Sequence, residues 1–342
     1  MGGGSGLILL DPYPRTLEQI FTGETRTRLE ALGDVEWHDG PRVADADVDA
    51  ALADVVAIVG QTDLPRSRLD RAPKLRAVLN VEGNFLPNVD YDECFRRGIY
   101  VLVISPVFGQ AVAEMALGLA LAAARDIPRG DAEVRAGTEV LLDEGRNAGS
   151  FLLAGKTLGL VGCGNLGRAL LPHLRPFGGE ILVHDPWLQD AVVRELGAAP
   201  VALDELFARS RVVFILSAVT TENQGLLGER EFGAMQPGGV VVLASRAAVV
   251  DWDALLSAAE SGRIKVATDV FPAEPIPADE RARSAPNTVL SAHRAGNIPE
   301  IWPIVGEMVV DDLAWILRGL PPQRMTRAQP ETVARFRSRP VG

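Results

Sequence analysis

The stretch GKTLGLVGCGNLGRAL, residues 155–170, decides the fold. It connects an unbroken apolar run, TLGLV, to a helical segment through a glycine-rich turn. Its glycines have the G-x-G-x-x-G spacing, in which the first makes a tight turn, the second lets a pyrophosphate reach the backbone and the third lets the helix pack closely. The free N–H groups at the start of such a helix favour phosphate binding. The sequence therefore predicts a dinucleotide-binding turn made of Gly162, Gly164, Asn165, Leu166 and Gly167.

The next apolar run, ILVHD, ends in an acidic residue that fits the same kind of site. Asp185 follows Gly167 by 18 residues, close to the spacing at which a carboxylate binds the hydroxyl groups of the adenosine ribose. A carboxylate there repels a 2′-phosphate, so we predict NAD and not NADP as the cofactor. A structural turn followed by a surface aspartate is the alternative interpretation.

Short apolar runs alternate with helical segments along the rest of the chain. The runs are unbroken, as in parallel strands that are buried on both faces. Between them lie segments such as DWDALLSAAESG, where Asp251 is suited to start a helix and Gly262 to end it. This alternation predicts an α/β fold with two Rossmann-like, doubly wound units. The predicted strands are LILL, VVAIV, LRAVLN, IYVLVI, TLGLVG, ILVHD, VVFILSA, VVVLAS, KVATDV and TVLSAH.

The composition is that of a globular protein with two domains. The 342 residues exceed what one hydrophobic core usually organises, and 47% of them are hydrophobic against 23% charged. The net charge of −11 argues against nucleic acid as a partner, because nucleic-acid binding needs a basic surface. Two cysteines are too few for a disulfide framework or a zinc cluster, and we predict no metal site.

The sequence also predicts a cytoplasmic protein that does not contact a membrane. Its longest apolar helical stretch, AVAEMALGLALAAA, has about 14 residues, whereas a membrane span needs about 20. The opening MGGGSG lacks the basic and apolar regions of a signal peptide. The tail after Leu320 is rich in proline and arginine, and we expect it to lie along a surface.

Three further patches follow predicted strands of the dinucleotide-binding unit. LASRAAVVD contains Arg246, DVFPAEP contains Asp269 and Glu274, and SAHRAGN contains His293. The carboxyl ends of parallel strands face the ligand crevice, so these side chains are placed to meet around the nicotinamide. Each alone has a structural alternative: Arg246 as a solvated charge, Glu274 as a loop carboxylate, His293 as a capped strand end. Their joint occurrence after a dinucleotide motif favours a catalytic site.

From about residue 75 to 320 the sequence resembles the D-isomer-specific 2-hydroxyacid dehydrogenases. The resemblance is carried by AVAEMALGLALAAARDIPRGDAEVRAG, GKTLGLVGCGNLGRAL, SGRIKVATDVFPAEPIPAD and NTVLSAH, in this order. It implies an NAD-binding Rossmann domain, residues 112–299, inserted into a discontinuous flavodoxin-like substrate domain, residues 1–111 and 300–342. It also implies a homodimer, commonly built through the NAD-binding domains.

The activity implied by the resemblance is the interconversion of a small 2-hydroxy acid and its 2-keto acid by hydride transfer with NAD. An imidazole holds and releases a proton near neutral pH, which suits His293 as the acid/base, with Glu274 bonded to its other ring nitrogen. The planar donors of Arg246 suit a substrate carboxylate. Glyoxylate, hydroxypyruvate and 3-phosphoglycerate-like acids are the candidate substrates. The remaining implied positions are Gly83, Asn84 and Phe85, whose backbone would hold the carboxylate, and Ser217, Ala244, Ser245 and Asp269, which would line the nicotinamide and its ribose.

Several residues depart from the family pattern. Phe85 stands where the substrate loop usually has a second glycine, and Leu243 stands where an asparagine is common. The family's aliphatic residue after the histidine is Arg294 here. Alternation along a strand would turn Arg294 away from a cleft-facing His293, whereas a loop would let it bind a second carboxylate or phosphate of the substrate. Both interpretations stay open.

Two other functions fit the same motifs. An NAD(H)-sensing binding protein, similar to corepressors of this fold, would keep the arginine, glutamate and histidine without turnover. The acidic charge and the lack of a recognisable peptide-docking insert weigh against it. A dehydrogenase of another small anion, such as formate or phosphite, is the second alternative, because the loop around Phe85 is unusual.

Overall fold

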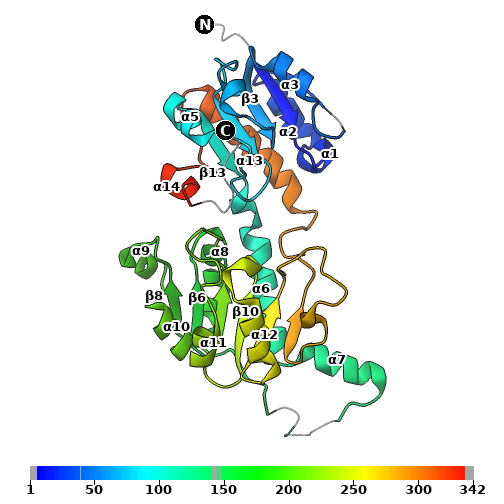
Figure 1. Ribbon diagram of the computed structural model, residues 1–342, viewed down its shortest axis with the longest axis vertical. Helices are drawn as coiled ribbons and strands as arrows, with labels where there is room; N and C mark the ends of the chain where they lie inside the picture. The colour runs from blue at the N-terminus through cyan, green and yellow to red at the C-terminus, as the bar shows by residue number, and fades with distance from the viewer. Residues whose placement is uncertain (1–5, 39, 141–144, 146–147, 336–342) are drawn as a thin grey trace. The chain divides into compact units, whose positions relative to one another are not determined.

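The chain forms two compact units. The computed structural model describes residues 6–38, 40–140, 145 and 148–335, so the first five residues of the opening MGGGSG and the last seven of the tail lie outside the described residues. Unit 1 comprises Met1–Phe108 with Ile298–Gly342, and unit 2 comprises Gly109–Asn297 (Figure 1). The first boundary between the units falls where α6 (Gly109–Ala124) begins, three residues before the predicted start of the NAD-binding domain at residue 112.

Unit 1 is built around a six-stranded sheet with the order β13-β5-β4-β3-β1-β2. All neighbouring strands are parallel except β13, which pairs antiparallel with β5. The direction of strand order reverses between β1 and β3, which makes this the switch point at which α/β folds commonly bind ligands. The strands are β1 (Leu7–Asp11), β2 (Asp34–Glu36), β3 (Val55–Gly60), β4 (Ala77–Asn80), β5 (Tyr100–Val103) and β13 (Thr326–Arg327).

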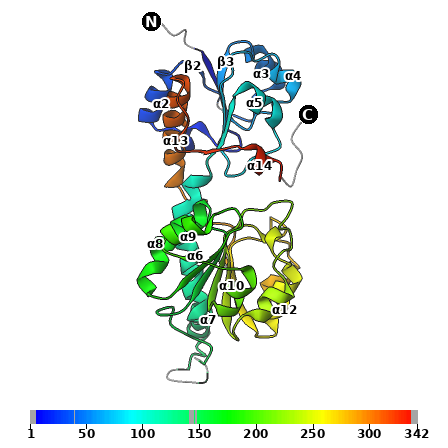
Figure 2. The same cartoon turned by 90° about the vertical axis from the view of Figure 1, so that its left-hand side faces the viewer.

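Helices cover both faces of this sheet. In Figure 2, α2 and α13 lie on one side of it, and α3, α4 and α5 lie on the other. Helix α5 begins where the Asp90 side chain accepts the N–H of Glu93 and ends at Gly98, whose φ of 70° is left-handed. The helices are α1 (Leu17–Ile20), α2 (Gly23–Glu30), α3 (Asp45–Ala51), α4 (Arg66–Leu69), α5 (Tyr91–Arg97), the 3₁₀ helix η1 (Ser105–Phe108), α13 (Ile301–Leu317) and α14 (Pro330–Val333).

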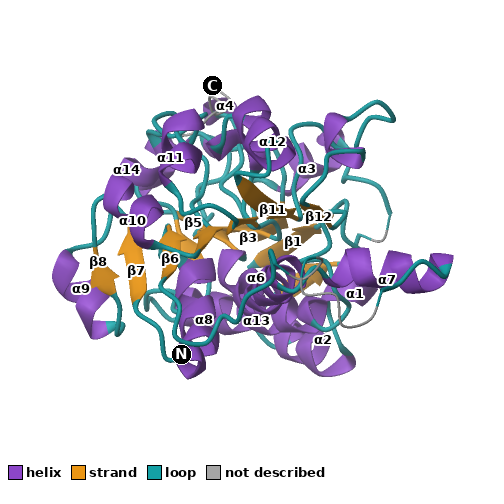
Figure 3. Cartoon of the chain, turned by 90° about the horizontal axis from the view of Figure 1, so that it is seen from below, coloured by secondary structure: helices purple, strands orange, loops and turns teal. Residues whose placement is uncertain are grey.

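Unit 2 contains a seven-stranded sheet in which every pair is parallel, in the order β12-β11-β10-β9-β6-β7-β8. Figure 3 shows β8, β7 and β6 side by side at one edge. The strand order reverses between β6 and β9, directly beside the glycine-rich turn. The strands are β6 (Leu158–Val161), β7 (Ile181–His184), β8 (Ala199–Pro200), β9 (Val212–Ile215), β10 (Gly239–Leu243), β11 (Ile264–Thr268) and β12 (Thr288–Leu290).

The helices of unit 2 also lie on both faces of its sheet. Helix α6 contacts α8, β10 and β11, whereas α10 contacts β6 and β7, and α12 contacts β11 (Figure 2). As predicted, Asp251 caps α12, accepting the N–H of Ala254 at 3.0 Å. The other helices are α7 (Ile127–Ala136), α8 (Asn165–Leu174), η2 (Arg175–Phe177), α9 (Asp190–Glu195), α10 (Leu203–Arg209), α11 (Glu229–Ala234), η3 (Ala247–Val249), α12 (Trp252–Glu260) and η4 (Arg281–Arg283).

The prediction of an α/β fold with parallel sheets is confirmed, but the apolar helix is longer than predicted. The helical run Ser105–Ala124 has 20 residues and is apolar and long enough, by length and composition alone, to cross a membrane. However, 56% of its apolar window is buried inside the protein, and eight residues of α6 are buried. This burial is typical of a core helix.

Candidate active site

The glycine-rich turn between β6 and α8 has the geometry that the motif predicts. Gly162 has a φ of +90°, and a Cβ at this position would lie 2.6 Å from the Cα of Ser217. A Cβ on Gly167 would lie 2.6 Å from the carbonyl oxygen of Gly162. At Gly164, by contrast, a Cβ would meet no atom within 4 Å. The first and third glycines are therefore required by packing, while the second faces open space that a phosphate group could approach.

Asp185 lies directly after β7 and is tied to this turn. Its Oδ2 accepts the N–H of Cys163 at 2.7 Å, and its Oδ1 accepts the N–H of Trp187 at 2.9 Å. A carboxylate oxygen has two lone pairs, so each keeps one further acceptor position. The carboxylate is thus held rigidly at the strand end and can still accept hydrogen bonds from ribose hydroxyl groups.

Two buried hydroxyl groups mark the carboxyl ends of the next strands. The Oγ atoms of Ser217, after β9, and Ser245, after β10, are buried and have no hydrogen-bond partner among the described residues. Ala244 lies beside Ser245 and is 5% exposed. Buried polar atoms without partners are rare in folded proteins and are often completed by a ligand. Together with the open side of Gly164, these hydroxyls fit a dinucleotide cofactor at this end of the sheet.

His293 and Glu274 form a direct pair. The ring Nδ1 of His293 lies 2.5 Å from Oε2 of Glu274, and the two side chains are 40% and 34% exposed. The other oxygen, Oε1, accepts the N–H of Phe271 at 3.1 Å, which fixes the carboxylate. An ionised carboxylate only accepts hydrogen bonds, so it binds the ring at Nδ1–H and leaves Nε2 to exchange a proton with a ligand.

Asp269 holds the backbone that carries His293. It is 1% exposed, and its two carboxylate oxygens accept the N–H groups of Arg294 and Ala295, both at 2.9 Å. Its carbonyl accepts the N–H of His293 at 2.8 Å. These bonds stabilise the left-handed conformation of His293, whose φ is +51°. By resemblance, Asp269 was expected to line the nicotinamide; its hold on the backbone of residues 293–295 was not predicted, because the sequence indicates only that Asp269 stands at a strand end.

Arg246 follows β10, beyond the same carboxyl ends of the strands as Glu274 and His293. Strands β10, β11 and β12 are neighbours, so Arg246, Asp269 and His293 all follow carboxyl ends of adjacent parallel strands. The Arg246 side chain is exposed, and its Nη1 donates to the carbonyl of Ser245 at 2.7 Å. No hydrogen bond or ion pair joins it to Glu274 or His293, both of which the structure describes. The predicted trio therefore forms one direct contact, between Glu274 and His293.

Of the two interpretations of Arg294, the one based on strand alternation does not apply here. Strand β12 ends at Leu290, and His293 lies in a loop with a left-handed φ, so the alternation of strand side chains does not apply to Arg294. The Arg294 side chain is exposed and forms no ion pair with any described residue. Leu243, the departure in β10, is fully buried in the hydrophobic core of unit 2.

The predicted carboxylate-binding loop follows β4 in unit 1. The backbone N–H groups of Gly83 and Asn84 donate to no atom of the described residues. The ring of Phe85 packs edge-on against Tyr91, with ring centroids 6.5 Å apart, at the border of the unit's core. Phe85 therefore packs against the hydrophobic core of unit 1. A Cβ on Gly83 would lie 2.8 Å from the ring of Phe108, which explains the glycine.

The two cysteines, Cys94 and Cys163, are buried. Burial raises the pKa of the Cys94 thiol to about 12 and that of the Cys163 thiol to about 11, so neither forms a thiolate nucleophile at neutral pH. Among the described residues, no group of three or more histidine, cysteine, aspartate and glutamate side chains could hold a metal ion.

These features define a family. The family model described as "D-isomer specific 2-hydroxyacid dehydrogenase, NAD binding domain" matches residues 117–295, which include the glycine-rich turn and the histidine–glutamate pair. The chain belongs to the D-isomer-specific 2-hydroxyacid dehydrogenases.

Individual relatives differ in the substrate that their names give. The chain is 29% identical to D-3-phosphoglycerate dehydrogenase of Methanocaldococcus jannaschii over 85% of this chain and 55% of that protein. It is 33% identical to glyoxylate reductase of Thermococcus litoralis over 76% of this chain and 79% of that protein. The chain thus spans about half the length of the curated phosphoglycerate dehydrogenases it matches.

Solved structures share the fold over nearly the whole chain. A phosphoglycerate oxidoreductase from Rhizobium etli is 40% identical, with a TM-score of 0.84 over 95% of this chain and 98% of that one. An NADPH-dependent glyoxylate/hydroxypyruvate reductase from Sinorhizobium meliloti is 26% identical, with a TM-score of 0.71 over 94% of this chain and 97% of that one. Both are oxidoreductases by name, and they differ in substrate.

Proposed function

We propose that the protein is an NAD-dependent oxidoreductase that interconverts a small 2-hydroxy acid and its 2-keto acid. The observation that carries the proposal is the pair of His293 and Glu274, joined at 2.5 Å beyond the carboxyl ends of the sheet that holds the glycine-rich turn. Proton transfer to a carbonyl oxygen requires a positioned acid/base side chain. Here the carboxylate of Glu274 orients the imidazole of His293. Family membership supports the same reaction.

In this proposal each residue has one task. The bound dinucleotide supplies or accepts the hydride at the substrate carbon. His293 gives the proton from Nε2 to the keto oxygen and takes it back in the reverse direction, while Glu274 fixes the ring and balances the imidazolium charge. Arg246 binds the substrate carboxylate through its planar donors. In unit 1, the free N–H groups of Gly83 and Asn84 are also suited to donate to a carboxylate.

We also propose NAD as the preferred cofactor. Asp185 presents a carboxylate that accepts ribose hydroxyls and repels a 2′-phosphate. The Sinorhizobium meliloti relative is named NADPH-dependent, so the preference needs its own measurement. We expect kcat/KM to be at least tenfold higher with NADH than with NADPH, and a lower value with NADH would contradict this part of the proposal.

A homodimer in the cytoplasm completes the proposal. Unit 2 exposes apolar side chains on and near α7, with Ile127 at 56%, Val134 at 64% and Leu152 at 65% exposure. A second copy of unit 2 would bury such a surface. Size-exclusion chromatography with light scattering should give a mass near 73 kDa for the wild type, twice the chain mass of 36.6 kDa. The double variant Ile127→Glu, Val134→Glu should give a monomer. A monomeric wild type would contradict the homodimer.

The decisive experiment measures NADH oxidation at 340 nm against a panel of 2-keto acids. We expect turnover by the wild type and a loss of about 10²–10⁴-fold in kcat for His293→Asn, because the general acid is removed. Glu274→Gln should lose less of the kcat, since the glutamine still contacts the His293 ring but carries no negative charge. Turnover of no 2-keto or 2-hydroxy acid by a protein that still binds NADH would overturn the proposal.

A further inference from the structure

A small hydrophobic cluster in unit 2 joins α12 to the segment that connects β11 to β12. Glu274 lies in this segment. Two members of the cluster, Trp252 and Leu256, come from α12, and Trp252 also packs against the main hydrophobic core of the unit. The other members, all from the segment, are Phe271, Ile276, Ala282 and Ala285. Trp252 therefore lies between the core and the part of the chain that carries Glu274.

The indole of Trp252 contacts the segment before Glu274. It packs edge-on against the ring of Phe271, with ring centroids 5.8 Å apart at an interplanar angle of 66°. Phe271 is only 7% exposed, and its N–H donates to Oε1 of Glu274 at 3.1 Å. Among the described residues, the Glu274 side chain has hydrogen bonds only to this N–H and to the His293 ring. The direction of the carboxylate therefore depends on where the backbone of Phe271 is held.

The same indole also contacts the segment after Glu274. Its Nε1–H donates to Oε1 of Glu280 at 3.0 Å, and that oxygen accepts the N–H of Ala282 at 3.3 Å at the start of η4. An indole N–H is a donor only, and it needs a partner when the ring packs against a core. Trp252 thus holds residues 271 and 280, on the two sides of Glu274.

The ion pairs between α12 and the same segment lie on the surface. Nε of Arg281 donates to Oε1 of Glu260 at 2.8 Å, and the two side chains are 39% and 35% exposed. Arg281 also lies 3.4 Å from Asp253, which is 89% exposed. Exposed pairs of this kind contribute little to stability. The apolar cluster and the Trp252 hydrogen bond are therefore the main attachment of the segment to α12.

We propose that Trp252 is a positioning residue for the proton transfer. By holding Phe271 and Glu280, it keeps the carboxylate of Glu274 directed at Nδ1 of His293. The inference rests on the proposed function, in which Nε2 of His293 exchanges the proton with the substrate. Trp252 acts through Glu274 and not through the cofactor turn, because α12 contacts α11 and β11, whereas the glycine-rich turn follows β6.

The first measurement follows the tautomer of His293. An oriented carboxylate accepts Nδ1–H and so favours the Nδ1–H tautomer of the neutral ring, whereas an imidazole without a partner prefers Nε2–H. Nitrogen-15 NMR of histidine-labelled protein at alkaline pH reports this ratio. The chain has only four histidines, and His293→Asn identifies the signals.

The tautomer should depend on the two contacts of Trp252. We expect Nδ1–H to dominate in the wild type and Nε2–H to dominate in Trp252→Leu, which loses both contacts. Trp252→Phe keeps the aromatic contact with Phe271 but not the bond to Glu280, and it should fall between them. Glu280→Gln, whose amide oxygen still accepts the indole N–H, should behave as wild type.

The second measurement is steady-state kinetics with the 2-keto acid that turns over fastest. We expect Trp252→Leu to lower kcat about tenfold and Trp252→Phe about threefold, with KM for the keto acid and Kd for NADH changed by less than about twofold. In a Glu274→Ala background, Trp252→Leu should lower kcat by less than about twofold further, since no carboxylate is left to position.

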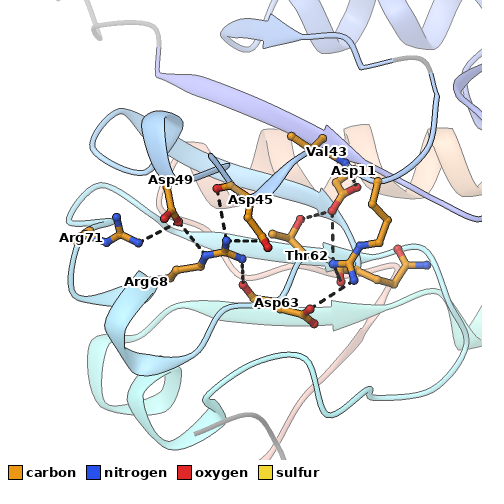
Figure 4. Close-up of polar contacts among 10 residues, drawn as sticks. Asp11, Val43, Asp45, Asp49, Thr62, Asp63, Arg68 and Arg71 are labelled. Carbon is orange, nitrogen blue, oxygen red and sulfur yellow. Dashed lines mark hydrogen bonds and ion pairs between the residues drawn. The ribbon is translucent and has the colours of Figure 1, made fainter. Parts of the chain in front are cut away.

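The control is a comparable attachment between two helices of unit 1. Figure 4 shows Arg68 of α4 held by Asp45 and Asp49 of α3, and the Arg68 side chain is only 12% exposed. Arg68→Gln removes the guanidinium that both carboxylates bind. We expect it to lower Tm without changing the His293 tautomer and with kcat within about twofold of the wild type. Loss of stability and loss of positioning are thus measured separately.

Two outcomes would overturn the role of Trp252. One is an unchanged tautomer in Trp252→Leu and Trp252→Phe, and the other is a kcat loss that is equally large in the Glu274→Ala background. If Trp252→Leu does not fold, Trp252→Phe decides by the same criteria. No turnover of any 2-keto acid overturns the proposed function alone, because the tautomer of His293 still shows whether Trp252 positions Glu274.

Discussion

At the scale of single residues, the site depends on a histidine held in an unfavourable backbone conformation. A non-glycine residue with positive φ is strained and persists only where surrounding bonds determine it. The backbone of residues 293–295 donates three hydrogen bonds to Asp269, one to its carbonyl and two to its carboxylate. The position of the His293 ring therefore depends on a buried side chain that need not touch the substrate.

This dependence gives a prediction for Asp269→Asn. The amide would place an NH₂ group against the N–H of Arg294 or Ala295, so one bond becomes a repulsive contact. We expect kcat to fall at least tenfold while KM for the keto acid changes less than threefold, because the loop that orients His293 loosens. Steady-state kinetics check this, with the exposed Asp279→Asn as control. A normal kcat in a folded Asp269→Asn variant would contradict the positioning role.

The residue types of the site could be predicted, but side-chain directions could not. The family resemblance implied that Glu274 bonds to the ring of His293, and the two side chains are in contact in the structure. The ring of Phe85 packs toward the core because of Tyr91, a tertiary contact that no local pattern encodes. Likewise, the alternation argument for Arg294 required a strand that continues to residue 294, whereas β12 ends at Leu290.

At the scale of elements, the long apolar runs were predicted correctly, and three of the four edge strands were missed. Each of the ten predicted runs forms a strand, since parallel central strands are buried on both faces and need unbroken apolar sequences. Strands β2, β8 and β13 have only two or three residues and lie at or near sheet edges. Their sequences, DVE, AP and TR, contain no run to detect, because tertiary pairing alone makes them extended.

Strand β13 is held by a buried aspartate on α13. Asp312 is fully buried, and its carboxylate accepts the N–H groups of Gln323, Arg324 and Met325 at 2.7–3.2 Å. This cluster turns the chain so that residues 326–327 pair with β5. Within the described part of the tail, residues 321–335, the chain thus extends the sheet of unit 1.

We therefore predict that Asp312→Asn detaches the tail. An amide cannot accept all three N–H groups, and the loss should cost about 2–3 kcal/mol of the folding free energy of unit 1. Thermal unfolding should show a lower Tm, and trypsin should cleave after Arg324 or Arg327 faster than in the wild type. Asp253→Asn on α12, where the side chain is 89% exposed, should behave as wild type. Unchanged cleavage would mean that the β13–β5 pairing holds the tail unaided.

At the scale of the whole molecule, each of the two units has a hydrophobic core made of its own described residues. The core formed by β6, β9, β10 and their helices contains only residues of unit 2. The core around Leu9, Ile58, Val78 and Tyr91 contains only residues of unit 1. Two such units were predicted from the alternation of apolar runs and from the chain length, since 342 residues exceed what one hydrophobic core usually organises.

The cofactor should therefore protect the two units unequally. A ligand that binds only the native state at a hundred times its Kd adds about 2.7 kcal/mol to stability, which is about a hundredfold slower exchange of amides that open by unfolding. In hydrogen-exchange mass spectrometry with NADH, we expect this slowing for peptides covering β6, β9 and β10, and less than a threefold change for β1, β3 and β4. Gly164→Val, which fills the open side of the turn, should abolish the protection without unfolding unit 2. Equal protection of both sheets would mean that the units unfold together as one cooperative body, in spite of their separate cores.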